Sequence, residues 1–437
     1  MAGSKVQLPY NPRVLHWARE RAVLDVREVA EALKVSEQKI RDWEAGTSTP
    51  TVRQGRLLAA RYDLHFLEFF SDEIPEVQPV KLAPDYRAAK IQGEQGPKEK
   101  RKLEKIQEWA EEQRLNALSL IEALDETVPA FPEHLRSHIE IDVERAAESS
   151  REAMGLNIEA QLSFTKAERQ RFPSILRDKI ESLGVLVLKR SDITDLAVRG
   201  ICFFAIPLPI IVFGKESPGA QAFTLAHELG HVLLGNSAVS GPPSLGGKSG
   251  HHAIEDWCNR FASAFLAPRT ALSAMFPKPN SAAPDIEPSL LSDLAGKFAM
   301  SRHAMLIRLI NLGYVQSQFY WKTMRPRFLQ EEREYKSYGR SKYYARRYIN
   351  RKGNYYTGLV MSAWSSGQIG AHNAAEYMGI KRFKQIQQIR ADYELQTFAS
   401  GYTSSTTALT RSAKKSRFRM NRVVTLSALD KLSLSGF

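Results

Sequence analysis

Apolar residues recur at helical spacing from about residue 11 to residue 70. Ser36 stands between two short amphipathic segments and is a good N-cap for the second one, Glu37–Glu44. Gly46 then ends this second segment. The pattern predicts a small all-α domain over residues 10–72. Its expected core residues are Trp17, Ala18, Val26, Val29, Ala30, Leu33, Ile40, Trp43, Leu57, Leu58 and Ala59.

A segment rich in proline, glycine and charge follows this domain, and it predicts a linker over residues 73–100. A long helical region is expected next, from about residue 98 to residue 156. The apolar residues that suit its amphipathic pattern are Leu103, Ile106, Trp109, Leu115 and Leu118.

Helix and strand patterns alternate between residues 175 and 235. A helix is expected over residues 175–183, and Ser217 and Pro218 form a good N-cap and first-position pair for the helix that carries His227. Three apolar runs predict strands. These runs cover residues 184–188, 201–204 and 210–213.

The remaining chain is predicted to be mainly helical. Glycine, serine and proline predict a loop over residues 237–250, and helices are expected over 254–266 and, as a pair, over 290–312. Beyond Tyr314 the chain becomes basic and aromatic, and it is expected to be helical again from about residue 358 to residue 398.

Composition narrows the class of protein. The chain has 437 residues, of which 43% are apolar and 25% charged, and this size allows two to four domains with real cores. It contains no run of about 18 apolar residues and no apolar signal core, so we expect no membrane association. The only two cysteines, Cys202 and Cys258, form no CxxC pair, which fits a reducing cytoplasm.

The formal net charge is +13, and such a balance favours polyanions as partners. Much of the positive charge lies late in the chain. We divide the end of the chain into a basic, mainly helical C-terminal region over residues 316–400 and a flexible basic tail over residues 401–437.

The run His227-Glu228-Leu229-Gly230-His231 carries the clearest chemistry. Two histidines four residues apart project from one face of a helix, where neutral imidazoles can bind one zinc ion. Glu228 is offset from that face, so it can act as general base on a metal-bound water. Because the flanking residues are apolar, the helix should be buried, and buried polar groups need a partner such as a metal.

A catalytic zinc usually has three protein ligands and one open position. The third ligand is expected from the next helix, where Glu255 is the best candidate, with Asp256, His251 and His252 as alternatives. Asn259, one turn after Glu255, can hydrogen-bond a ligating histidine. One of His251, His252 and Lys248 is an alternative candidate for stabilising the oxyanion.

The run from Gly219 to His231, together with Glu255, Cys258-Asn259 and Leu266-x-Pro268, resembles the ImmA/IrrE metallopeptidase family. Pro84-Asp85-Tyr86-Arg87 is similar to an upstream motif of members that carry an N-terminal regulator domain. The resemblance covers roughly residues 10 to 315. It implies an α+β peptidase fold with a small sheet beside the metal helix, here over residues 101–315, and regulated cleavage of a repressor protein. The implied ligands are His227, His231 and Glu255, and the implied base is Glu228.

The segment Val35–Gly46 resembles the helix-turn-helix of the XRE type. The resemblance implies binding of double-stranded DNA by the polar residues of its second helix. The alternative is a module that docks a partner protein or the peptidase itself. The expected DNA contacts are Ser36, Gln38, Lys39 and Arg41.

Two later segments allow two interpretations each. Residues 335–356 interleave lysine and arginine with tyrosine. This pattern suits a nucleic-acid surface and, slightly better, a solvated helix face with inward tyrosines. Residues 291–313 resemble a second helix-turn-helix, although such a pair usually closes a peptidase core.

The sequence therefore predicts a multidomain zinc endopeptidase that cleaves a specific transcriptional repressor. The alternative is a DNA-binding regulator or toxin–antitoxin component whose zinc site is structural or sensory. A homodimer is compatible with either function, because helix-turn-helix modules often read paired half-sites.

Overall fold

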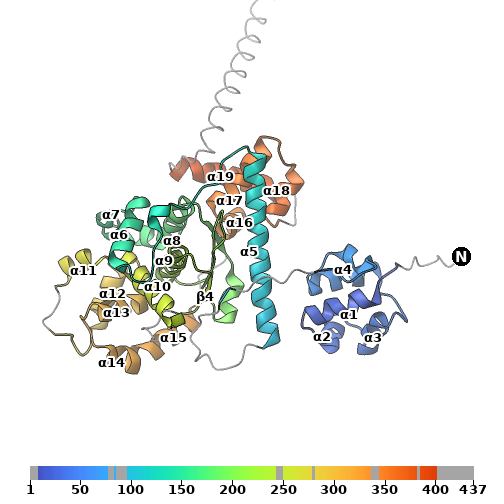
Figure 1. Ribbon diagram of the computed structural model, residues 1–437, viewed down its shortest axis with the longest axis horizontal. Coiled ribbons are helices and arrows are strands. Elements are labelled where there is room, and N and C mark those ends of the chain that lie inside the picture. The colour runs from blue at the N-terminus through green and yellow to red at the C-terminus, as the bar shows by residue number, and fades with distance from the viewer. Residues whose placement is uncertain are drawn as a thin grey trace, which may run out of the picture. The chain divides into compact units, whose positions relative to one another are not determined.

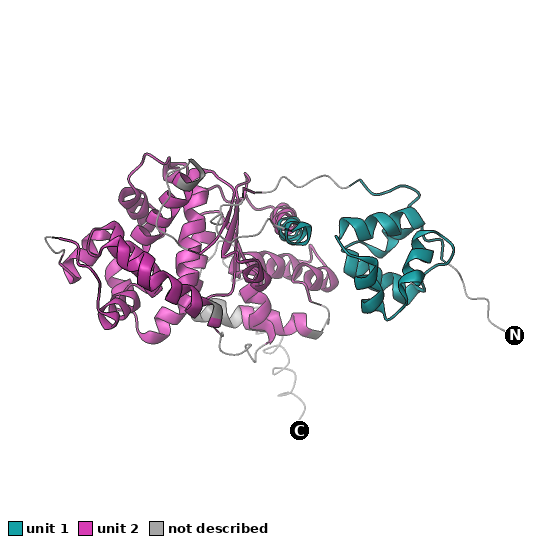
Figure 2. Cartoon of the chain, turned by 90° about the horizontal axis from the view of Figure 1, so that it is seen from below, with its two compact units in different colours: residues 1–82, 91–109 teal, residues 83–90, 110–437 magenta. Residues whose placement is uncertain are grey.

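The computed structural model describes residues 8–76, 83–84, 96–242, 250–277, 281–335, 344–380 and 384–400. The fold is mostly helical with one small mixed sheet, consistent with a multidomain α+β protein (Figure 1). The chain divides into two compact units (Figure 2). Unit 1 comprises residues 1–82 and 91–109, and unit 2 comprises residues 83–90 and 110–437.

Residues 8–76 of unit 1 form four short helices and a 3-10 turn. They are α1 (Pro12–Arg21), α2 (Val26–Leu33), α3 (Glu37–Glu44), α4 (Val52–Tyr62) and η1 (Phe66–Phe70). Lys34 ends α2 in the left-handed conformation, and Ser36 caps α3 by accepting a hydrogen bond from the Lys39 amide at 3.3 Å, as its sequence predicts. Most of the expected core is buried here, including Ile40 and Trp43, whereas Leu57 is exposed.

The long helical region expected after the linker is interrupted in the structure. Of the expected linker, residues 77–82 and 85–95 lie outside the described residues. The Pro84 carbonyl accepts a hydrogen bond from the Val239 amide, so this short segment lies against the sheet of unit 2. The helix α5 (Pro97–Ala123) then begins, and it ends well before residue 156. The single long helical region was therefore wrong, because Pro129 and Pro132 lie in an irregular stretch before α6 (Val143–Ala153).

Unit 2 is built on a four-stranded sheet with the order β1-β3-β2-β4. The strand β1 (Leu186–Lys189) is parallel to β3 (Ile210–Phe213), and β2 (Gly200–Phe203) is antiparallel to β3 and β4. These strands confirm the three runs expected from the sequence. The loop prediction for residues 237–250 was wrong at its start, because β4 (Ala238–Ser240) pairs there with β2.

Helices cover both faces of the sheet. Val187, Cys202 and Ile211 pack in one core with α8 (Lys166–Glu181) and α9 (Pro218–Leu234), and the alternate residues Leu188 and Val212 are buried as well. Figure 1 shows α8 and α9 on one side of the sheet and α5 with α16 (Tyr344–Lys352) on the other. Burial on both faces explains why the strands are apolar throughout.

Further helices complete unit 2. The helix α10 (Gly250–Leu266) packs on α9, and both α6 and α13 (Arg302–Asn311) pack on α10. In chain order, the short α7 (Ile158–Leu162) follows α6 and the short α11 (Arg269–Met275) follows α10. The helix α12 (Pro288–Lys297) packs on α13.

The region after Tyr314 is helical and continuous with this core. It contains α14 (Ser317–Phe319), the π-helical turn η4 (Tyr320–Met324), α15 (Arg325–Glu334), α16, α17 (Asn354–Ser365), α18 (Ala371–Tyr377) and α19 (Lys384–Ser400). None of the helices in the described part of the chain combines the length and apolar character needed to cross a membrane. The basic tail over residues 401–437 lies outside the described residues.

Candidate metal centre

The site lies on α9, a helix whose first and last residues follow from capping residues in the sequence. Ser217 occupies the N-cap position with Pro218 in the first turn, and Gly235 ends the helix with a φ of 67°. All residues from 222 to 233 are buried. A helix buried this completely can hold polar groups only where they meet partners.

Three side chains converge beside this helix. The Nε2 atoms of His227 and His231 lie 3.2 Å apart, and the carboxylate of Glu255 lies 3.4 Å from the first and 3.1 Å from the second. Their ligand atoms all fall within 4.8 Å of one another. Two imidazole nitrogens and one carboxylate are the donor set of many catalytic zinc sites.

The helix α10 brings Glu255 to this point because α9 is narrow where the two helices cross. A Cβ at Gly230 would lie 3.2 Å from Cys258 Sγ and 3.3 Å from Phe261 Cδ1. Trp257 and Phe261 of α10 stack with their rings at an angle of 3°, and both side chains are buried. Gly230, within the histidine motif, therefore permits the close approach of α10 that brings the Glu255 carboxylate to the two histidines.

The electrostatics of the three residues favour a bound cation. Burial would raise the pKa of Glu255, but the two imidazoles lower it to about 2. Burial lowers the pKa of His231. Burial also acts to lower the pKa of His227, but the charge and hydrogen bond of Glu255, with smaller contributions from Glu228 and Asn259, together raise it. A buried carboxylate that is held ionised between two imidazole nitrogens fits a divalent metal such as zinc.

Glu228 lies next to these residues but outside their set. Its side chain is fully buried, and burial raises its pKa to about 8. Its carboxyl group packs against Gly200 of β2, where a Cβ would lie 2.7 Å from both Glu228 Cγ and Cδ. The hydroxyl of Ser240 on β4 is close enough to lower the pKa of Glu228 somewhat. Glu228 therefore sits between the metal helix and the sheet.

The other residues that the sequence suggests for the site differ in whether they contact the three clustered residues. Asn259 is buried beside His227, and its hydrogen bond favours the charged imidazole. Asp256 pairs with Arg260 at 3.8 Å and does not belong to the three-residue cluster. His251 and His252 lie in the first turn of α10, but their side chains are outside the described part of the structure, as is Lys248.

Two residues of the site could not be found from the sequence. Gly200 and Ser240 belong to no recognisable motif, and they reach Glu228 only because β2 and β4 pair beside α9. Strand pairing joins residues far apart in sequence, so spacing along the chain carries no signal for it.

The comparisons with known proteins bear on this same region. Residues 180–309 match the family model of the IrrE N-terminal-like domain of M78 peptidases. This segment is similar to an IrrE N-terminal-like domain. The prediction of an ImmA/IrrE-family peptidase domain is confirmed by this match, and the M78 domain contains all four strands, the three clustered residues, Glu228 and Asn259. No significant match was found among curated proteins or among solved structures.

The M78 match does not extend to the expected DNA contacts in unit 1. Ser36, Gln38, Lys39 and Arg41 are all exposed on α3 or at its cap. Gln38 donates a hydrogen bond to Asp42 at 2.9 Å, and Arg41 pairs with Glu37 at 2.7 Å. Part of this donor surface is therefore engaged with acidic residues of the same helix.

Proposed function

We propose that the protein is a zinc-dependent endopeptidase of the M78 type. The observation that carries this proposal is the convergence of His227, His231 and Glu255 with a buried, non-ligating Glu228 beside them. Three protein ligands leave one coordination position for water or a peptide carbonyl. A structural zinc site would instead have four protein ligands, and it would bind no water that a neighbouring carboxylate could deprotonate.

His227, His231 and Glu255 would hold the ion. When bound, zinc would polarise the substrate carbonyl and lower the pKa of the attacking water. Glu228 takes the proton from the attacking water and delivers it to the nitrogen of the departing amine. Asn259 orients the His227 ring, and Gly200 leaves the space in which the Glu228 carboxyl group lies.

The proposed substrate is a specific repressor protein. This part of the proposal is supported by the family resemblance and by unit 1, whose α2 and α3 are joined by a tight turn at Lys34 and present Ser36, Lys39 and Arg41 to solvent. In this reading unit 1 places the peptidase on DNA, in a cytoplasmic setting and as a monomer or homodimer.

The experiment is co-expression of the chain with proteins encoded beside it. Wild type should shorten one of these proteins to a single product, whereas Glu228→Gln should retain stoichiometric zinc and leave the protein intact. His227→Ala should lose zinc. Full cleavage by Glu228→Gln would remove this residue as the base, and undiminished zinc in His227→Ala would remove it as a ligand.

The alternative function is a DNA-binding regulator, or toxin–antitoxin component, with a structural or sensory zinc. The exposed donors of α3 favour it. Such a protein would bind DNA equally well as wild type and as Glu228→Gln, and no neighbouring protein would be shortened by either.

A further inference from the structure

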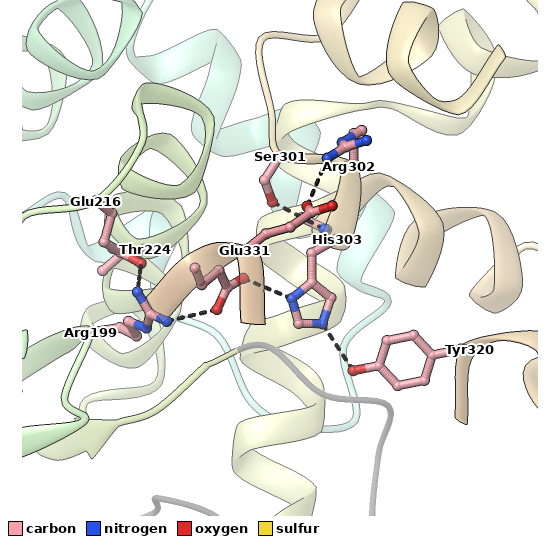
Figure 3. A network of polar contacts seen from close by, with 10 residues as sticks. Arg199, Glu216, Thr224, Ser301, Arg302, His303, Tyr320 and Glu331 are labelled. Atoms are coloured by element: carbon pink, nitrogen blue, oxygen red, sulfur yellow. Dashed lines mark hydrogen bonds and ion pairs between the residues drawn. The ribbon is translucent and has the colours of Figure 1, made fainter. Parts of the chain in front are cut away.

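A chain of polar contacts joins the metal helix to a helix outside the M78 domain (Figure 3). Arg199, just before β2, donates from Nη1 to Glu216 Oε1 at 3.0 Å and from Nη2 to Glu332 Oε2 at 2.6 Å. Glu332 belongs to α15, and its other oxygen lies 2.9 Å from His303 Nδ1. His303 Nε2 lies 2.9 Å from the hydroxyl of Tyr320.

Each hydrogen bond of this chain pairs a donor with an acceptor. With a neutral His303, the Tyr320 hydroxyl donates to Nε2 and Nδ1–H donates to Glu332. Arg199 then donates to both carboxylates, and the Thr224 hydroxyl donates to Glu216 Oε2 at 2.7 Å. His303, Tyr320 and Glu216 are buried, so each lost partner would leave an unsatisfied group away from water.

The near end of the chain meets the metal helix. Thr224 lies three residues before His227 and four before Glu228, on the same face of α9. Glu216 also accepts a hydrogen bond on its backbone carbonyl from Gln221 at 2.5 Å, so it holds the first turns of α9 twice. The N-terminal half of the metal helix is thereby fixed one turn before the ligands.

The other arm of the chain reaches the general base through the sheet. Arg199 directly precedes Gly200, the residue against which the Glu228 carboxyl group packs. One guanidinium thus ties the start of β2 to the loop that leads into α9. A planar guanidinium can bridge two carboxylates in a fixed geometry, which an ammonium group cannot do.

We propose that Glu332 is a positioning residue for the metal site and acts through Arg199. The inference rests on the zinc site of the proposed function. Glu332 lies outside the matched segment 180–309, so a residue of the C-terminal helices completes the geometry of the M78 domain. Metal ligands and a base must be held within about 0.5 Å, and Arg199 without its second carboxylate has one anchor in place of two.

The chain offers a matched control at the neighbouring position. Glu331, also on α15, pairs with Arg302 at 2.7 Å, and both side chains of this pair are about half exposed. An exposed pair of this kind contributes little to structure. Glu331→Gln and Glu332→Gln therefore make the same chemical change on the same helix, but only the second touches Arg199.

The test uses the full chain loaded with zinc or with Co²⁺ as a spectroscopic probe. Zinc loss to a chromophoric chelator is timed for wild type, Glu332→Gln, Arg199→Met, the double variant and Glu331→Gln. Glu332→Gln and Arg199→Met should each release zinc about tenfold faster, the lower end expected for residues behind a metal ligand. Both should also alter the visible Co²⁺ spectrum, and the double variant should be no worse than Arg199→Met alone.

Identical zinc release and Co²⁺ spectra for Glu332→Gln and Glu331→Gln would overturn the proposal. So would fully additive effects in the double variant, because Glu332 would then act independently of Arg199. If Glu332→Gln does not fold, Arg199→Lys replaces it, and wild-type zinc release by that variant counts equally against the proposal. These readouts do not require cleavage, so they remain decisive even if the chain proves not to be a peptidase.

Discussion

Single residues near the metal site are constrained by the volume of their neighbours. Gly200 lies where the Glu228 carboxyl group needs space, and Gly230 lies where α10 approaches α9. The missing side chain leaves space for the Glu228 carboxyl group in the first case and for α10, the helix that carries Glu255, in the second. The chemistry of the site thus depends on two glycines as well as on its ionisable residues.

Gly200→Ala should impair Glu228, the proposed general base, and leave the proposed metal ligands in place. The three atoms nearest to the added Cβ all belong to the Glu228 side chain, so the substitution would displace its carboxyl group. A displacement of about 1 Å can lower a catalytic rate about 100-fold. We expect such a loss in cleavage of the identified substrate with zinc content unchanged. Gly370→Ala, whose Cβ would meet only Asn373 at an ordinary 3.5 Å, should cleave normally.

At the scale of elements, α16 packs against β1 and contacts α5 through a buried lysine. Lys352 donates a hydrogen bond to Gln113 of α5 and lies 4.9 Å from the centre of the Tyr356 ring. Burial lowers the pKa of Lys352 from its ordinary 10.5 to about 7. The folded protein therefore holds this proton less tightly than the unfolded chain does.

This difference in pKa makes stability depend on pH. The contribution of Lys352 is present above about pH 10.5 and is lost as pH falls toward about 7, at about 1.4 kcal/mol per pKa unit. Lys352→Met should thus flatten the decline of the free energy of unfolding between pH 10 and pH 7, measured by denaturant titration. Lys322→Met, which removes an exposed lysine, should run parallel to wild type. An unchanged slope in Lys352→Met would contradict the assignment.

The helix α3 allows a separate test of DNA binding by unit 1. Arg41 is held by Glu37 at 2.7 Å, and Glu37→Gln would release it and remove a negative charge. If α3 contacts DNA, nonspecific duplex affinity should rise, and its logarithmic salt slope should steepen by about 0.9 for one added phosphate contact. Glu31→Gln breaks the equivalent exposed pair with Arg27 on α2 and serves as the control. Equal anisotropy titrations for both variants would argue against α3 as the contacting helix.

For the whole molecule, the M78 match ends before the folded core does. Arg177 on α8 donates to the Asn350 carbonyl at 2.6 Å, and Glu181 accepts from the Tyr355 amide at 3.1 Å, so the turn between α16 and α17 is anchored in the peptidase unit. Removing those helices would expose β1 and leave a buried ion pair without its backbone partners.

A chain that ends at residue 343 should accordingly lose at least about 10 °C in its thermal midpoint, or fail to fold. A chain that ends at residue 400 should keep the wild-type midpoint in differential scanning calorimetry. The latter should also elute earlier from heparin, because residues 401–437 carry seven basic side chains and one acidic side chain. Equal midpoints for both truncations would show that the C-terminal helices are dispensable to the core.

The sequence alone determined the parts of this protein that depend on near neighbours. The helix of His227 and His231, its cap at Ser217 and Pro218, and the three apolar strand runs follow from periodicity and capping, which act within a few residues. The same rules misjudged β4, since a three-residue strand has almost no signal of its own and forms only by pairing with β2.

The tertiary structure alone decided which distant groups meet. It brought Glu255 of α10 to the two histidines of α9 and left the next residue, Asp256, beside Arg260. It also placed Gly200 against Glu228, and Glu332 against Arg199, across 133 residues of chain in the latter case. Such contacts are set by packing and strand pairing, and neither is encoded in the local spacing of residues.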